Sequence, residues 1–103
     1  MPSRSLPIKL SPKARQDFID ILRYTGQTWG PQQLALYRDK IDGALQAIGR
    51  NPQAGHRRDD LPDTHRLYFV GAHVIVYRTE DSCVGVLRLL HQRMSLSRHL
   101  PRA

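Results

Sequence analysis

Two proline-marked helix starts, at Ser11-Pro12 and at Gly30-Pro31, constrain this chain more than any other feature of its sequence. Proline suits the first turn of a helix and glycine suits a helix end, so the second pair ends one helix and begins another. Apolar side chains recur at spacings of three and four along both stretches. The stripes comprise Ala14, Phe18, Ile21, Leu22, Thr25 and Trp29 in the first, and Leu34, Tyr37, Ile41, Ala44, Leu45 and Ile48 in the second. The short link makes the two helices an antiparallel hairpin.

Strand patterns stand on both sides of this hairpin. Residues 8–10 alternate ahead of the first helix. After the second helix, residues 51–64 are rich in turn-forming and charged residues. They show neither the apolar spacing of a helix nor the alternation of a strand, which indicates a surface loop. Two strands then meet at Gly71 and Ala72, and a third strand covers residues 83–90.

Three consecutive strands with short turns form an antiparallel meander, and the hairpin can bury its stripes only against a face of that sheet. The sequence therefore predicts an α+β fold of one strand, a helical hairpin and a three-stranded antiparallel meander, with the helices packed on one face. We expect the first strand beside one of the later three, and one more helical turn at residues 96–100.

Size and composition narrow the class of protein. The 103 residues, 40% of them hydrophobic, suffice for one core, so we expect a single domain over residues 1–103. No apolar run approaches the length of a membrane span, no secretory signal is visible, and Cys83 is the only cysteine, so we expect a protein of the reducing cytoplasm. The formal charge of +7 indicates an anionic partner, either phosphate backbones, an acidic protein or a membrane surface.

The last strand carries an arginine among aliphatic residues. Simple alternation places Leu87 and Leu89 against the helices and Arg88 on the open face of the sheet. We predict a basic binding surface there, since the planar guanidinium suits carboxylates and phosphates. Its candidate residues are Arg57, Arg58, Arg66, Arg78, Arg88, His91 and Arg93. The alternative is that these arginines only pair with acidic side chains and keep the face solvated.

Other chemistry has less support in the sequence. The five histidines show no spacing typical of a metal site, and we expect no metal and no cofactor. His91 and His99 beside Arg93 form a candidate acid and base pair for RNA cleavage. Tyr24 and Trp29 lie on or beside the helical stripe, which predicts core positions and not platforms for stacking bases.

Several segments together resemble a known family. They are "LSPKARQDFIDI", "YTGQTWGPQQ", "NPQAG", "HRLYFVGAHVIVYR" and "VGVLRLLHQRM", in this order from Leu10 towards His99. In these segments the chain resembles the ParE toxins of the RelE/ParE superfamily of bacterial toxin–antitoxin systems. The family's fold is a strand, a helical hairpin and a three-stranded meander, which agrees with the order derived above. The genetic role implied is a growth-arrest toxin that stabilises a plasmid or a chromosomal region.

The resemblance also implies a partner. Antitoxins of the ParD kind carry an acidic C-terminal segment that folds against the helical hairpin and the sheet of the toxin, which would suit the positive charge of this chain. We therefore expect a hetero-oligomer of toxin and antitoxin. On the helices, the residues expected to form the antitoxin groove are Phe18, Leu22, Leu34, Tyr37 and Ile41.

Two targets divide the superfamily. ParE members are described as poisons of DNA gyrase, whereas RelE-like members are mRNA endoribonucleases that act in the ribosomal A site. Arg66 and Arg93 resemble two catalytic arginines of the RelE-like enzymes, and His99 lies near their C-terminal Tyr or His. Their catalytic lysines are missing, because Lys40 is the last lysine of the chain. The sequence thus favours gyrase poisoning over an mRNA interferase, with a non-toxic antitoxin-binding module as a third alternative.

Overall fold

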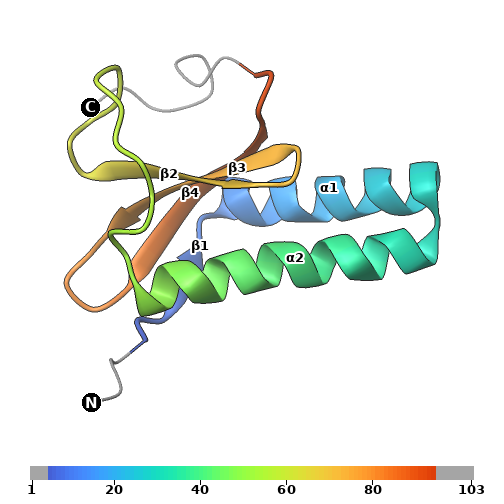
Figure 1. Ribbon diagram of the computed structural model, residues 1–103, viewed down its shortest axis with the longest axis horizontal. Helices are drawn as coiled ribbons and strands as arrows, with labels where there is room; N and C mark the ends of the chain where they lie inside the picture. Colours follow the sequence, from blue (N-terminus) through green and yellow to red (C-terminus); the bar gives the residue numbers. More distant parts are fainter. Residues whose placement is uncertain (1–4, 95–103) are drawn as a thin grey trace.

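The hairpin predicted from Pro12 and Pro31 is present in the computed structural model, which describes residues 5–94 (Figure 1). Helix α1 (Pro12–Trp29) and helix α2 (Pro31–Arg50) follow strand β1 (Ile8–Leu10) and precede β2 (His65–Val70), β3 (His73–Thr79) and β4 (Val84–His91). The strands form one sheet in the order β1-β4-β3-β2. The predicted α+β fold is confirmed, while the helical turn expected at 96–100 lies outside the described residues.

Short-range chemistry explains where the helices begin and end. The Ser11 hydroxyl accepts a hydrogen bond from the Ala14 N–H (3.0 Å), the usual action of an N-cap. It also donates to the Leu87 carbonyl (2.8 Å), so the cap attaches α1 to β4. Gly30 has φ +93°, a conformation that glycine adopts without strain, and its N–H bonds to the Gly26 carbonyl (2.9 Å). One glycine therefore ends α1 and turns the chain into α2.

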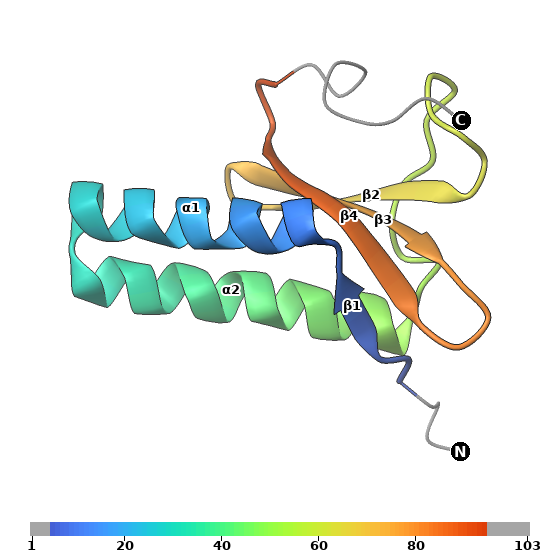
Figure 2. The ribbon, with the colours of Figure 1, turned by 180° about the vertical axis from the view of Figure 1, so that it is seen from behind.

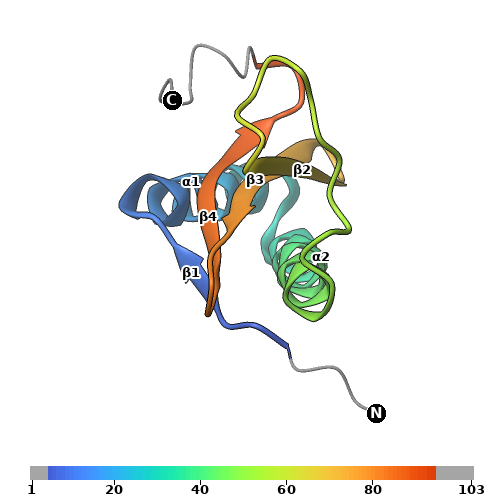
Figure 3. The same cartoon turned by 90° about the vertical axis from the view of Figure 1, so that its left-hand side faces the viewer.

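The first strand joins the sheet beside the last. Ile8 and Leu10 of β1 pair in parallel with Val84 and Val86 of β4, while β2, β3 and β4 form the predicted antiparallel meander (Figure 2). The loop between α2 and β2 runs past the outer edge of β2 (Figure 3), where His56 makes an isolated bridge to Leu67. This bridge partly covers a sheet edge that would otherwise expose unpaired backbone groups.

A bulge in β4 changes which residues face the helices. The register passes from Tyr77 opposite Val86 to Val76 opposite Arg88, so Leu87 is the extra residue. Regular alternation predicted Leu87 against the helices, and that prediction is wrong. The main core between helices and sheet consists of Ala14, Ile21, Ile41, Ala44, Leu45, Ile48, Val70, Ile75, Tyr77, Val84, Val86 and Leu89.

The opposite face of the sheet is also covered. Its side chains form a second, smaller core that comprises Leu61, Leu67, Val74, Val76 and Leu90, with Leu87 packed against it. Leu61 belongs to the loop predicted from the turn-rich segment, which therefore packs on the sheet and does more than connect two layers. The sheet face predicted to be open and basic is thus largely apolar and buried.

Candidate functional site

Arg88 is a structural residue in this fold. Its Nε donates to Oδ2 of Asp17 (2.7 Å) and its Nη2 donates to Oδ1 of the same carboxylate (3.0 Å). The Leu89 N–H also donates to Oδ2 of Asp17 (3.0 Å), and the two charged side chains are only 17% and 15% exposed. Hydrogen bonding to Asp17 raises the pKa of Arg88 despite the burial that opposes it. The prediction that Arg88 presents its charge on an open face is therefore wrong.

Arg66 and Arg78 lie on opposite faces of the sheet. Arg66 is opposite Tyr77 and so points to the helix side, where its Nη1 donates to the carbonyl of Gly55 (3.0 Å) and more weakly to that of Gln53 (3.4 Å). Arg78 is one residue further along β3 and therefore points to the other side. The single cluster of arginines predicted from the sequence is not assembled.

Arg57 and Arg58 lie in the loop and are paired there. Arg57 Nη2 is 3.1 Å from Oδ1 of Asp63, and Arg58 makes two hydrogen bonds to Asp60, of 2.9 and 2.7 Å. All four side chains are at least 46% exposed, so these pairs stabilise the fold little. For these two arginines, the alternative of pairing with acidic side chains agrees with the structure.

Arg93 follows β4 and is exposed, and its guanidinium has no ion pair among residues 5–94. Its backbone N–H donates to Nδ1 of His91 (3.1 Å). Val70, His73 and His91 share one row across the sheet, four residues further along β2 than Arg66. At about 3.3 Å per residue, this row is roughly 13 Å from the row of Arg66, and Arg93 lies beyond it. His99, Arg98 and the remaining C-terminal residues lie outside the described part.

Four of the five residues expected to form the antitoxin groove on the helices are partly buried, and one is fully buried. Ile41 is fully buried, so it supports the surface from beneath and does not line it. Phe18 and Tyr37 are half-buried against the main core, and Leu22 and Leu34 are half-buried as well. Their predicted role in binding remains a prediction.

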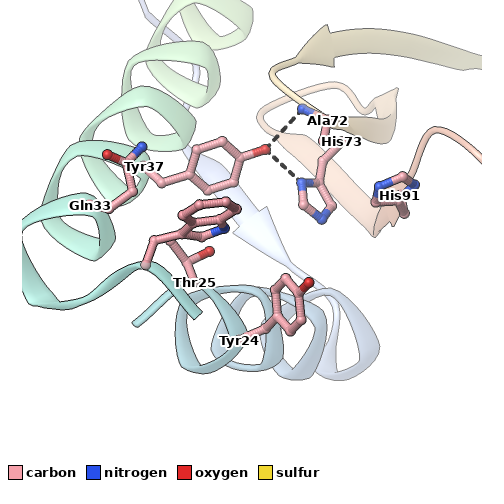
Figure 4. Close-up of a pocket in the computed structure, with 8 residues that line it drawn as sticks. Tyr24, Thr25, Gln33, Tyr37, Ala72, His73 and His91 are labelled. Atoms are coloured by element: carbon pink, nitrogen blue, oxygen red, sulfur yellow. Dashed lines mark hydrogen bonds between the residues drawn. The ribbon is translucent and has the colours of Figure 1, made fainter. Parts of the chain in front are cut away.

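A pocket of about 230 Å³ lies instead where the far part of the hairpin meets the β2–β3 turn and the end of β4 (Figure 4). Its walls are Tyr24, Thr25, Trp29, Gln33, Tyr37, Ala72, His73 and His91. Trp29 is 70% exposed and Tyr24 is 65% exposed, so the prediction that they belong to the core is wrong. Figure 1 shows the reason, because the hairpin extends beyond the sheet and its last turns have no strand to cover them.

Tyr37 holds one wall of the pocket in place. Its hydroxyl accepts a hydrogen bond from the Ala72 N–H (3.2 Å) and is hydrogen-bonded to Nδ1 of His73 (2.6 Å). The rings of His73 and His91 meet edge to face, with centroids 5.4 Å apart. Burial lowers the pKa of His73, and the neighbouring His91 lowers it further. The Tyr37 hydroxyl therefore attaches the β2–β3 turn to α2.

The arrangement of two helices on a mixed four-stranded sheet is shared with bacterial proteins of known structure. A chain of the chromosomal ParDE toxin–antitoxin system from P. aeruginosa superposes with a TM-score of 0.72 and 16% identity, over 86% of this chain and 98% of that one. The YoeB dimer from Staphylococcus aureus gives a TM-score of 0.62 and 20% identity, over 85% and 98%. The fold therefore belongs to the class seen in these ParDE and YoeB structures.

Sequence comparison narrows this class to one family. The profile described as ParE toxin of type II toxin-antitoxin system, parDE, matches residues 8–96. Toxin ParE1 of Caulobacter vibrioides is 34% identical over 94 residues, which is 91% of this chain and 97% of that protein. Toxin ParE1 of Mycobacterium tuberculosis is 34% identical over 92 residues, 88% and 94% of the two chains. The chain belongs to the ParE family of type II toxins, which confirms the resemblance seen in its sequence.

Neither α1 nor α2 combines the length and the apolar character that crossing a membrane would require, and this holds for the whole described range 5–94.

Proposed function

We propose that this toxin poisons DNA gyrase and is neutralised by an acidic antitoxin of the ParD kind. The observation that carries the choice of target is the separation of Arg66 from Arg93. A nuclease needs cationic groups that converge on one scissile phosphate, where the developing charge is stabilised. Here Arg66 lies in a row of the sheet roughly 13 Å from the row of His91, and Arg93 follows His91 after the end of β4.

The hydrogen bonds of the Arg66 side chain also support gyrase over ribosome-bound messenger RNA as the target. Its guanidinium is directed to the carbonyls of Gln53 and Gly55 and so helps to hold the chain that leaves α2. No lysine follows Lys40, so neither the loop after α2 nor the strands β2, β3 and β4 contain a lysine of their own. A poison that traps gyrase on cleaved DNA acts by binding, so it requires no such cluster of catalytic bases.

The charge balance supports an acidic antitoxin. The chain has 16 Lys and Arg against nine Asp and Glu. Among the nine, Asp17, Asp39, Asp60 and Asp63 are already in ion pairs with arginines of the same chain. A partner with excess carboxylates would therefore gain favourable electrostatic energy and associate quickly. We expect a toxin–antitoxin hetero-oligomer whose affinity falls as salt rises.

The test uses purified toxin, purified gyrase and relaxed plasmid DNA. We expect supercoiling to be inhibited, and addition of the small acidic protein encoded beside the toxin gene to restore it. A parallel reaction with messenger RNA on ribosomes should leave the RNA intact. Cleavage of that RNA in the A site, with gyrase unaffected, would replace this proposal by the mRNA interferase alternative.

A further inference from the structure

We infer that a groove at the end of α2 binds a backbone phosphate of DNA. The inference rests on the proposed gyrase poisoning and adds to it a contact with the DNA itself. The groove has a volume of about 510 Å³ and lies where the chain leaves α2, beside the beginning of β2 and the end of β3. Figure 3 faces this end of the molecule.

The polar residues that line the groove are of the kinds that bind the DNA backbone. Phosphate oxygens accept hydrogen bonds mainly from arginine, lysine, hydroxyl and amide side chains. The polar lining consists of Asn51, Gln53, Asp63, Thr64, Arg66 and Thr79. Among residues 5–94 no aromatic ring lines the groove, so it lacks the surface on which a base would stack. The composition therefore favours the backbone over a base.

Arg66 supplies positive charge, and part of its guanidinium is available to a ligand. Its Nη1 donates to the carbonyls of Gly55 (3.0 Å) and Gln53 (3.4 Å), which holds the group in place. Its Nε and Nη2 donate to no atom of residues 5–94, and the guanidinium has no ion pair there. Because the side chain is already held at one nitrogen, it loses less freedom when the other two bind a phosphate.

The backbone carbonyls beside the groove already accept hydrogen bonds. A carbonyl oxygen carries partial negative charge, which would repel a phosphate unless a donor offsets it. Such donors are present here, since the carbonyls of Asn51, Pro52, Gln53 and Gly55 accept from the Ala54 N–H, the Tyr77 hydroxyl and Arg66. The last carbonyls of α2 carry a partial charge of about half an elementary charge, which one guanidinium outweighs.

The charge of Asp63, the acidic residue in the lining, is balanced. Its Oδ1 lies 3.1 Å from Nη2 of Arg57, and its side chain is 95% exposed. A paired and solvated carboxylate of this kind repels a phosphate only weakly. Arg50, the last residue of α2, is exposed and has no ion pair within residues 5–94, so it adds positive charge beside the groove.

The remaining donors distinguish a phosphate from a carboxylate. A carboxylate is satisfied by two parallel hydrogen bonds from one guanidinium. The Thr79 hydroxyl and the side-chain amide of Gln53 make no hydrogen bond to residues 5–94 and would then stay unused. A phosphate in a DNA strand, with its additional oxygens, can accept from these groups as well.

The test uses a short DNA duplex labelled with fluorescein, purified toxin, and fluorescence anisotropy at several salt concentrations. Arg66→Gln should weaken binding about tenfold and reduce the salt dependence by about one phosphate contact. Thr79→Val keeps the bonds from Arg66 to the loop and should weaken binding about threefold. Arg23→Gln is the matched control and should change affinity less than about twofold. Arg23 is exposed on α1, outside the groove, and has no ion pair in the described range.

Thermal unfolding shows whether each variant is folded. If Arg66→Gln and Arg23→Gln lose affinity equally, only net charge matters and the groove is refuted. Binding of Thr79→Val with unchanged affinity would also contradict it. Displacement of the duplex by polyglutamate as readily as by polyphosphate would assign the groove to carboxylates. Tighter binding of single-stranded RNA than of the duplex would assign it to RNA.

The effect on gyrase is measured separately, so that the two proposals fail independently. If wild type traps cleaved DNA on gyrase but does not bind the free duplex, the groove is refuted and gyrase poisoning stands. If wild type binds the duplex through Arg66 and Thr79 but leaves gyrase unaffected, the groove stands and gyrase poisoning is refuted.

Discussion

The guanidinium of Arg88 and the carboxylate of Asp17 form a paired hydrogen bond between β4 and α1, with donor–acceptor distances of 2.7 and 3.0 Å. The two residues are 71 positions apart, and the Leu89 N–H adds a third bond to the same carboxylate. Since Ser11 also caps α1 and bonds to Leu87, the first half of α1 is attached to the bulged part of β4 at several points.

Arg88→Ala should therefore destabilise the fold, because it leaves a largely buried carboxylate without its cation. We expect a loss of about 3 kcal/mol in the free energy of unfolding, measured with chemical denaturant. Asp39→Asn is the control, since Arg38 and Asp39 form an exposed pair at 3.7 Å and should change stability by less than about 0.5 kcal/mol. Equal effects of the two substitutions would show that Arg88 contributes no more than a surface charge.

Arg93→Ala, unlike Arg88→Ala, should leave the stability of the fold unchanged and reduce toxicity. Its side chain is exposed without an ion pair in the described range, so the free energy of unfolding should change by less than about 0.5 kcal/mol. If Arg93 contacts the target, growth arrest on expression of the toxin should be relieved. Colony counts after induction, compared with Arg57→Ala as the control, measure this. Full toxicity of a well-folded Arg93→Ala protein would exclude Arg93 from the target contact.

Tyr77→Phe tests how the long loop is held. The buried Tyr77 hydroxyl donates to the Pro52 carbonyl (2.8 Å) and accepts from the Gly55 N–H (2.8 Å). Its removal leaves a buried donor and acceptor unsatisfied, which should cost about 2 kcal/mol and speed amide exchange at Gly55. Tyr68→Phe is the control, because the Tyr68 hydroxyl has no hydrogen bond to the described residues. Unchanged exchange at Gly55 would contradict this account of the loop.

Acidification should destabilise the protein in the range where histidine titrates. Burial lowers the pKa of both His65 and His73, with smaller contributions from Arg78 and His91 respectively. Below about pH 6.5 the unfolded chain therefore binds more protons than the folded one, so stability falls as the pH drops and levels off below the folded pKa.

Thermal unfolding between pH 7.5 and pH 5 measures this dependence. The melting temperature should decrease across that range in wild type, and the decrease should be smaller in His65→Gln and His73→Gln. A melting temperature that stays constant or rises on acidification would contradict the assigned direction of both pKa shifts.

The sequence predicted the elements of the fold well because the signals for them are local. Pro12, Gly30 and Pro31 each set a helix boundary at their own position or next to it. The apolar spacing along each helix can likewise be read without knowing which element the helix packs against. Features that depend on contacts between distant segments were missed, because local signals do not report them. A bulge at Leu87 adds one residue and reverses the alternation beyond it, and no local pattern announces it.

The candidate site was harder to predict because it depends on distant contacts. The apolar stripe on α1 shows on which face of the helix Trp29 lies, but not whether the sheet extends far enough to cover it. The exposure of Trp29 was therefore not predicted. The pairing of Arg88 with Asp17 connects two segments with no pattern in common. Tyr37, in contrast, was singled out by its stripe, although its contacts with Ala72 and His73 required the folded chain.

The formation of cleaved DNA tests the central claim most directly. Plasmid, purified gyrase and purified toxin are incubated, the reaction is stopped with detergent and protease, and linear DNA is measured on a gel. A gyrase poison should produce linear DNA that increases with toxin concentration, requires gyrase and disappears when the antitoxin is added. No linear DNA at any toxin concentration, together with cleavage of ribosome-bound messenger RNA, would contradict it.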